Sequence, residues 1–128
     1  MKKEILIIDD DTQNILALTQ ILTPTYEVFA AKNGKEGVEL ALEKKPDLIL
    51  LDIIMPDMDG YVTLINLKNN AATQSVPIIV MSGLNDVIDI ERGLYLGAAE
   101  YLTKPFSDGL VLLRVKNVLL IEGVKNAR

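Results

Sequence analysis

The chain has 128 residues, 49% of them hydrophobic, with 18 acidic against 13 basic side chains and a net charge of −5. This length fits one domain with a single core, the acidic balance without a Lys/Arg cluster argues against nucleic-acid binding by this segment, and no apolar stretch approaches the ~20 residues of a membrane span. Cysteine and histidine are both absent, which excludes disulfides, thiolate metal sites and imidazole catalysis, and a reducing cytoplasm is the expected compartment.

Short apolar runs alternate with stretches of helical periodicity along the chain. Four of the five apolar runs are continuous or nearly so, which is typical of strands covered on both faces in a parallel sheet. In chain order we predict strand Ile5–Ile8, helix Gln13–Leu22, strand Tyr26–Ala30, helix Lys35–Lys44, strand Leu48–Leu51, helix Tyr61–Asn69, strand Pro77–Met81, helix Asp86–Leu96, strand Glu100–Leu102 and helix Ser107–Ile121. Right-handed connections then predict an α/β fold, a doubly wound five-stranded parallel sheet of flavodoxin-like order 2-1-3-4-5 with helices on both faces.

The last predicted helix is apolar around nearly its whole circumference. Arg114, Lys116 and Asn117 interrupt a run of Leu, Val and Ile between residues 110 and 121. One face is expected to pack on the sheet, and the rest is available for a partner, either a second domain of the same kind or a following domain. The alternative is a sheet-packed helix with scattered exposed leucines. We assign residues 1–121 to one domain and residues 122–128 to a C-terminal tail or a truncated linker.

Polar side chains follow four of the predicted strands. Asp9 and Asp10 follow the first strand, Asp52 the third, Ser82 the fourth and Lys104 the fifth. Ligands of open parallel sheets bind beyond the carboxyl ends of the strands, where the strand order reverses. In the predicted order the first and third strands are neighbours, so the sequence predicts one site built from these residues.

The acidic run Asp9-Asp10-Asp11 needs more than one explanation. A helix cap accounts for one carboxylate, most simply Asp11. The remaining carboxylates repel each other, and their crowding is explained if a cation lies among them. Oxygen ligands without His or Cys specify a hard ion, Mg²⁺ or alternatively Mn²⁺ or Ca²⁺. The nearby Asp57 and Asp59 lack the spacing of a calcium loop and are interpreted as turn residues.

Four motifs, in this order and spacing, resemble the receiver domain of two-component response regulators over residues 4 to about 121. They are Ile5-Leu6-Ile7-Ile8-Asp9-Asp10-Asp11, Leu50-Leu51-Asp52 with the loop to Gly60, Pro77-Ile78-Ile79-Val80-Met81-Ser82-Gly83 and Tyr101-Leu102-Thr103-Lys104-Pro105-Phe106. The resemblance implies that Asp52 accepts a phosphoryl group from a phosphohistidine on a histidine kinase or histidine phosphotransfer protein. It also implies a signalling domain that catalyses only its own phosphorylation and dephosphorylation.

The resemblance assigns the metal and the charge balance of the site. Asp10 would bind Mg²⁺ directly and Asp9 mainly through water, with Asp52 and the backbone carbonyl of Ile54 as further ligands. Lys104 would neutralise the phosphoryl group. Mg²⁺ and this lysine together offset the carboxylates and let an anion approach.

The resemblance also implies how the phosphate is read. The Ser82 hydroxyl would bond a phosphoryl oxygen, and Tyr101 would turn into the vacated space. The surface formed by the fourth helix, fifth strand and fifth helix would then change and control an output domain or partner. The Lys104–Pro105 bond is cis in the family, which would aim the lysine inward.

Two apolar residues flank the predicted site. Ile54 and Leu84 lie two residues after Asp52 and Ser82, and neither can orient a hydrolytic water. We therefore expect slow intrinsic loss of the phosphate.

Two other functions compete with this interpretation. Asp9-Asp10-Asp11-Thr12 is similar to the start of aspartate-nucleophile phosphatases of the haloacid dehalogenase type. However, the threonine falls one place early, the late acidic pair is missing, and Asp52 would have no role. A scaffold that is not phosphorylated is the third possibility, although every residue needed for phosphorylation is present. The cognate kinase, the controlled output and the extent of the full protein are not specified by these residues.

Overall fold

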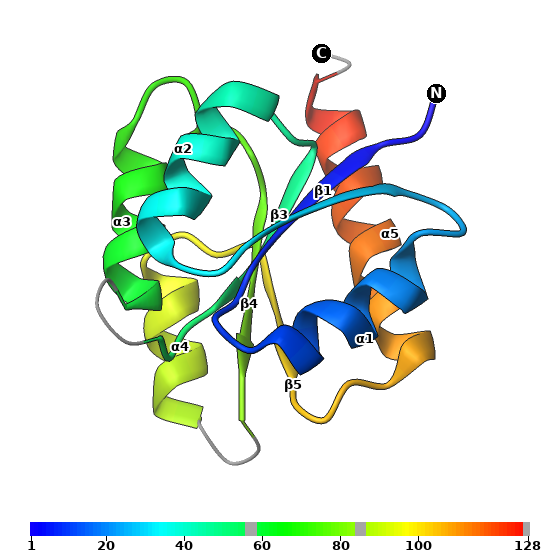
Figure 1. Ribbon diagram of the computed structural model, residues 1–128. Helices are drawn as coiled ribbons and strands as arrows, with labels where there is room; N and C mark the ends of the chain where they lie inside the picture. The colour runs from blue at the N-terminus through cyan, green and yellow to red at the C-terminus, as the bar shows by residue number, and fades with distance from the viewer. Residues whose placement is uncertain (56–58, 84–86, 127–128) are drawn as a thin grey trace.

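The computed structural model describes residues 1–55, 59–83 and 87–126, and its strands form a five-stranded parallel sheet (Figure 1). The strands are β1 (Glu4–Ile8), β2 (Glu27–Ala31), β3 (Leu48–Asp52), β4 (Ile78–Ser82) and β5 (Glu100–Thr103). Their order is β2-β1-β3-β4-β5. The predicted flavodoxin-like order is confirmed.

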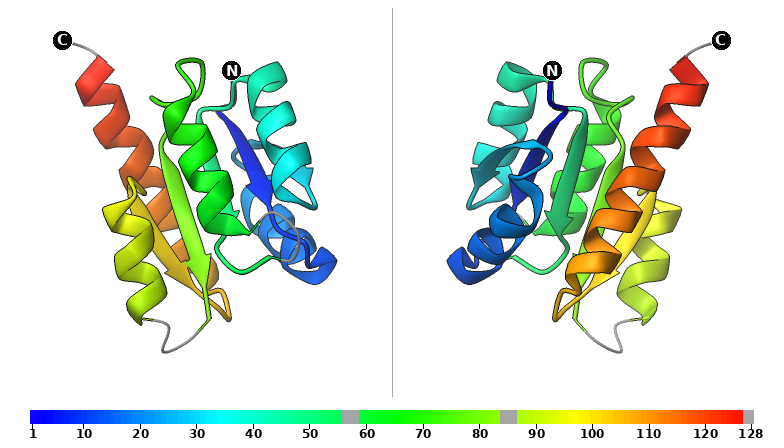
Figure 2. Two further views of the ribbon diagram at one scale, coloured as in Figure 1. Left: turned by 90° about the vertical axis from the view of Figure 1, so that its left-hand side faces the viewer. Right: turned by 90° about the vertical axis from the view of Figure 1, so that its right-hand side faces the viewer.

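Five helices cover the two faces of this sheet. They are α1 (Thr12–Leu22), α2 (Gly34–Lys44), α3 (Gly60–Asn69), α4 (Val87–Tyr95) and α5 (Asp108–Asn126). The two views of Figure 2 show α1 and α5 together on one face and the other three helices on the opposite face. None of the described helices is long and apolar enough to cross a bilayer.

Strand β1 shows how the sequence builds two cores from one sheet. Successive side chains of a strand point to opposite faces. Ile5 and Ile7 accordingly pack with residues of α1 and α5, whereas Leu6 and Ile8 pack with residues of α2 and α3. All four are fully buried, and each contributes roughly 1.5–3 kcal/mol relative to an exposed side chain. This is why the run is continuously apolar rather than alternating.

Acceptor side chains define the starts of three helices. Asp11 accepts a hydrogen bond from the Gln13 N–H at 2.9 Å and caps α1, as predicted. Asn33 caps α2 through the Glu36 N–H at 2.8 Å. Asp59 caps α3 through the Val62 N–H at 2.9 Å, which agrees with its interpretation as a turn residue.

Helix α5 is longer than the sequence pattern predicts. The apolar run suggests an end at Ile121, but the helix continues to Asn126. The extension contains no proline, and Gly123 costs only about 1 kcal/mol in a helix interior. Glu122 and Lys125, about one turn apart on the added segment, form an ion pair of 3.5 Å. The periodicity of core residues therefore underestimates the length of a helix whose last turns extend beyond the core.

Helix α3 begins directly against the end of β3. The Gly60 N–H donates a 2.8 Å hydrogen bond to the Ile53 carbonyl. A Cβ at this position would overlap the carbonyl oxygen of Asp52 and the Cα of Ile53. Only glycine permits this approach, which fixes the backbone that carries Asp52.

We predict that Gly60→Ala lowers the free energy of unfolding by about 3 kcal/mol, the upper end for overpacking, because the obstructing atoms belong to the backbone. Gly123→Ala is the matched control, since nothing lies within 4 Å of its added Cβ; it should gain up to about 1 kcal/mol. Urea unfolding of the two variants checks this. Equal free energies of unfolding for Gly60→Ala and the wild type would show that the backbone around Gly60 can accommodate a Cβ.

Candidate functional site

The predicted site residues converge at the carboxyl edge of the sheet, the lower edge in Figure 1. Asp9 follows β1, Asp52 and Ser82 are the last residues of β3 and β4, and Lys104 follows β5. β1 and β3 are paired neighbours, as are β3 and β4. The topology alone thus brings together side chains that lie up to 95 positions apart in the chain.

Three carboxylates and one ammonium group form the centre of the site. One oxygen from each of Asp9, Asp10 and Asp52 lies within 4.8 Å of the others. The Lys104 Nζ is 3.3 Å from the Asp52 Oδ2 and 3.9 Å from the Asp9 Oδ2. When all three carboxyls are ionised, two negative charges remain unbalanced.

Asp9 is the most constrained of the three acids. Its side chain is fully buried, and its Oδ1 accepts a 2.9 Å hydrogen bond from the Asp11 N–H. Its Oδ2 has no hydrogen-bond donor within the described part of the chain. Burial raises the pKa of Asp9 to about 6, with a further upward contribution from Asp52, while the Asp11 N–H and Lys104 oppose the shift.

Asp52 is almost as deeply buried but better partnered. Its Oδ1 accepts a 3.2 Å hydrogen bond from the Ile54 N–H, and its Oδ2 pairs with Lys104. Burial raises the pKa of Asp52 above its ordinary range, although the Lys104 ammonium and the Ile54 N–H both act to lower it. The carboxylate is therefore held in place by a backbone amide and a cation.

The donor set fits a hard divalent cation. All the ligand atoms offered by Asp9, Asp10 and Asp52 are carboxylate oxygens, which suits such ions. The Asp9 Oδ2, which accepts no hydrogen bond within the described residues, and the two unbalanced charges are what a bound dication would satisfy. Asp10, unlike the other two, is exposed.

Ser82 lies at the end of β4 with a weakly engaged hydroxyl. The residue is buried, and its carbonyl accepts a 2.8 Å hydrogen bond from the Lys104 N–H. Its Oγ donates to the Gly83 carbonyl at 3.5 Å, well beyond the usual 2.5–3.0 Å for a hydroxyl donor. This hydroxyl can be redirected at little cost.

Tyr101 on β5 contacts a residue that the sequence did not single out as functional. The Arg114 guanidinium lies 4.8 Å from the centre of the Tyr101 ring. The same guanidinium forms a 3.2 Å ion pair with Glu100. The sequence marks Arg114 only as a polar interruption in an apolar helix, because its partners come from another element.

The remaining predicted residues lie around this centre or outside the described residues. The Ile54 side chain is 60% exposed. Pro105 is exposed and the Lys104–Pro105 peptide bond is cis. Leu84 and Asp57 lie outside the described residues.

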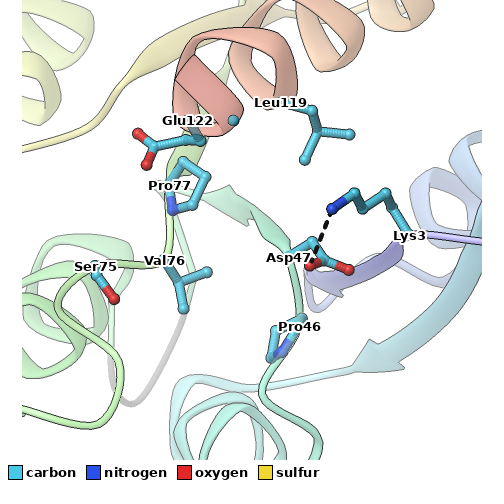
Figure 3. A pocket seen from close by; sticks show the side chains of 9 residues that line it. Lys3, Pro46, Asp47, Ser75, Val76, Pro77, Leu119 and Glu122 are labelled. Atoms are coloured by element: carbon cyan, nitrogen blue, oxygen red, sulfur yellow. Dashed lines mark ion pairs between the residues drawn. The ribbon is translucent and has the colours of Figure 1, made fainter. Parts of the chain in front are cut away.

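A hollow of about 190 Å³ lies at the opposite edge of the sheet (Figure 3). It is lined among others by Lys3 and Asp47 beside the starts of β1 and β3, and by Leu119 and Glu122 of α5. Lys3 and Asp47 form a 4.0 Å ion pair there. None of the strand-end residues lines this hollow, so it is separate from the carboxylate site.

Comparisons with known proteins point to one family. The family described as response regulator receiver domain matches residues 5–116. The chain is 40% identical over 111 residues to a probable cyclic di-GMP phosphodiesterase of Vibrio cholerae, covering 87% of this chain and 25% of that protein. It is 36% identical to response regulator PleD of Caulobacter vibrioides, covering 92% and 26%, and 36% identical to protein PilH of Pseudomonas aeruginosa, covering 90% and 96%.

A solved structure of a putative response regulator from Chloroflexus aurantiacus superposes with a TM-score of 0.90 at 30% identity, covering 94% of this chain and 99% of that chain. The chain thus spans about a quarter of the phosphodiesterase and of PleD.

The raised pKa of Asp9 predicts a pH-dependent stability in metal-free buffer. A carboxyl with a higher pKa in the folded state binds more protons when the protein is folded. The free energy of unfolding should therefore fall as the pH rises from 3.8, the ordinary pKa of an aspartate, to about 6, the pKa of Asp9 in the folded protein. Asp9→Asn should remove the contribution of Asp9 to this loss and raise the free energy of unfolding on the order of 2 kcal/mol near neutral pH, but not near pH 4.

Chemical denaturation of the wild type and Asp9→Asn across this pH range measures the effect. Glu43→Gln, at an exposed position of α2, is the control and should leave the pH profile unchanged. A wild type whose stability rises between pH 4 and pH 6, with Asp9→Asn unchanged, would contradict the assignment.

Proposed function

Because the chain belongs to the response regulator receiver domain family, we propose that Asp52 is the residue at which this two-component receiver domain takes up a phosphoryl group. The observation that supports it best is the pairing of the Asp52 Oδ2 with the Lys104 Nζ at 3.3 Å, inside a cluster with Asp9 and Asp10. The haloacid dehalogenase alternative is not supported, since the family match over residues 5–116 is to receiver domains.

The proposed reaction is a phosphoryl transfer from phosphohistidine to carboxylate. An Asp52 oxygen forms the new O–P bond as the N–P bond of the donor breaks, and the leaving imidazole takes a proton from solvent. The Ile54 N–H and Lys104 hold the Asp52 carboxylate in one orientation beforehand. Orientation and charge balance are the main contributions that a protein makes to such a transfer.

Asp9, Asp10, Asp52 and the backbone carbonyl of Ile54 would hold Mg²⁺, with Mn²⁺ as the alternative ion. When bound, the ion would supply charge neutralisation for the incoming phosphoryl group. Lys104 adds one positive charge beside Asp52, and its 27% exposed side chain can follow the anion. The domain catalyses only its own phosphorylation and dephosphorylation.

Ser82 and Tyr101 are the proposed readout. The weakly bonded Ser82 hydroxyl donates to a phosphoryl oxygen once the phosphate is present. Tyr101 responds from the edge strand β5 and is linked to α5 through Arg114. The surface of α4, β5 and α5 then differs between the two states.

The proposed partners follow from the family. Receiver domains act with histidine kinases, and we propose a histidine kinase or a histidine phosphotransfer protein as the donor. The matched part covers only 25–26% of two relatives, and we propose that the output is carried by a further domain, as their greater length allows. The proposal includes a cytoplasmic location, which fits the absence of cysteine.

Incubation with acetyl phosphate and Mg²⁺, followed by intact mass measurement, tests the phosphoacceptor. The wild type should gain one phosphoryl group per chain, and Asp52→Asn should gain none. Asp11→Asn is the matched control, because asparagine caps a helix as well as aspartate; it should be labelled normally. Full labelling of Asp52→Asn would contradict the assignment.

The exposed, apolar Ile54 side chain predicts a long-lived phosphate. Ile54→Asn places an amide where it can orient a hydrolytic water, and the decay of the adduct should become roughly tenfold faster. Ile54→Val keeps the position apolar and should decay like the wild type. The measurement is the loss of the adduct mass with time, and identical decay in all three proteins would refute the role of Ile54.

A further inference from the structure

Helix α5 carries an exposed apolar stripe along most of its length. Leu113, Leu120 and Val124 are 54%, 58% and 63% exposed, and Leu110 is 37% exposed. Asn117 lies midway between them and is also exposed. These five residues are called the α5 stripe.

The α5 stripe lies on the side of the helix away from the core. The core side consists of Val111, Val115 and Val118, which are at most 5% exposed and pack with β-sheet and α1 residues. At about 100° per residue, the stripe falls broadly opposite these three valines. A surface helix that packs against the core on just one side normally has a polar outer face. The outer face of α5 is apolar instead, so the helix has apolar surface for a second packing partner.

The spacing of the stripe is that of a coiled-coil seam. The steps between its residues are three, four, three and four positions, the a-d-a-d-a order of a heptad pattern. Leu110, Asn117 and Val124 take the a positions, and Leu113 and Leu120 take the d positions. Such a seam accepts the ridge of another helix with the same spacing.

Asn117 identifies which helix fits. An amide at a central a position loses hydrogen bonds if hydrocarbon covers it. In a parallel, in-register pair each a residue faces its own counterpart, so Asn117 meets Asn117. In an antiparallel pair a positions face d positions, and the amide would meet Leu113 or Leu120.

We propose that the α5 stripe binds a second copy of this chain, with the two α5 helices parallel, in register and related by a twofold axis. Lys116 and Ile121 flank the seam and face each other across it, so the lysine stem packs on isoleucine and no like charges meet. The inference goes beyond the phosphoacceptor function and does not rest on it.

The seam predicts a weak dimer. Two heptads bury less than the 1,200 Å² of standard interfaces, so we expect a dissociation constant on the order of 10–100 μM. Each copy carries a net charge of −5, and this repulsion is screened by salt. Dimerisation should therefore strengthen as the ionic strength rises.

Sedimentation equilibrium of the whole, unphosphorylated chain tests the proposal. The wild type should change from monomer to dimer between about 10 μM and 1 mM, and Leu113→Glu/Leu120→Glu should remain monomeric throughout. Ile88→Glu, at a 74% exposed position of α4, is the control for general surface apolarity and should dimerise like the wild type. Circular dichroism and labelling by acetyl phosphate verify that each variant is folded and that failure of the dimer is distinct from failure of Asp52 chemistry.

The orientation has its own test, because the chain has no cysteine. Asn117→Cys should form a disulfide-linked dimer on mild oxidation, whereas Lys35→Cys, on the exposed surface of α2, should not under the same conditions. A monomer at 1 mM, a dimer that survives Leu113→Glu/Leu120→Glu, or a dimer in which Asn117→Cys does not cross-link would each overturn the proposal.

Discussion

The buried negative charge of Asp9 and Asp52 is the constraint on which the arrangement of the site depends. The two carboxyls lie beside the ends of β1 and β3, where the sheet leaves almost no solvent contact. One ammonium group, from Lys104, reaches both. The pKa of each acid is nevertheless raised, because the positive charge of Lys104 offsets only part of the cost of burying the two carboxylates. The stability of the apolar sheet therefore supports a site that is poised to accept positive charge.

Most of this arrangement was predictable because it depends on regular features of the sequence. Continuous apolar runs mark strands buried on both faces, and the parallel order then places Asp52 beside Asp9. The same logic could not find Arg114, because its contact with Tyr101 depends on how α5 packs beside β5. Nor could it find the end of α5 at Asn126, where helix continues without core residues. The close approach of Gly60 to Asp52 is likewise a tertiary contact, although a glycine opening a helix was a clue.

The residues of the site differ in how firmly they are held. Asp52 has a backbone amide and an ammonium group as partners, and the backbone beneath it is fixed by Gly60. Ser82 keeps one long hydrogen bond, and Tyr101 lies on an edge strand. The rigid residues are those proposed to do the chemistry, and the loosely held ones are those proposed to move. This division suits a domain with two conformations, in which the phosphoacceptor keeps its position and the residues that report phosphorylation change theirs.

Helix α5 is long enough to connect the two edges of the sheet. Its 19 residues form a rod about 28 Å long, which starts four residues after Lys104 and extends past the opposite edge of the sheet, where Leu119 and Glu122 line a hollow. Arg114 joins the first half of this rod to Tyr101. A pivot of only about 5° near Arg114 would displace the far end by one to two ångströms. The length of the helix therefore means that a small rotation near Arg114 would be enlarged at its far end.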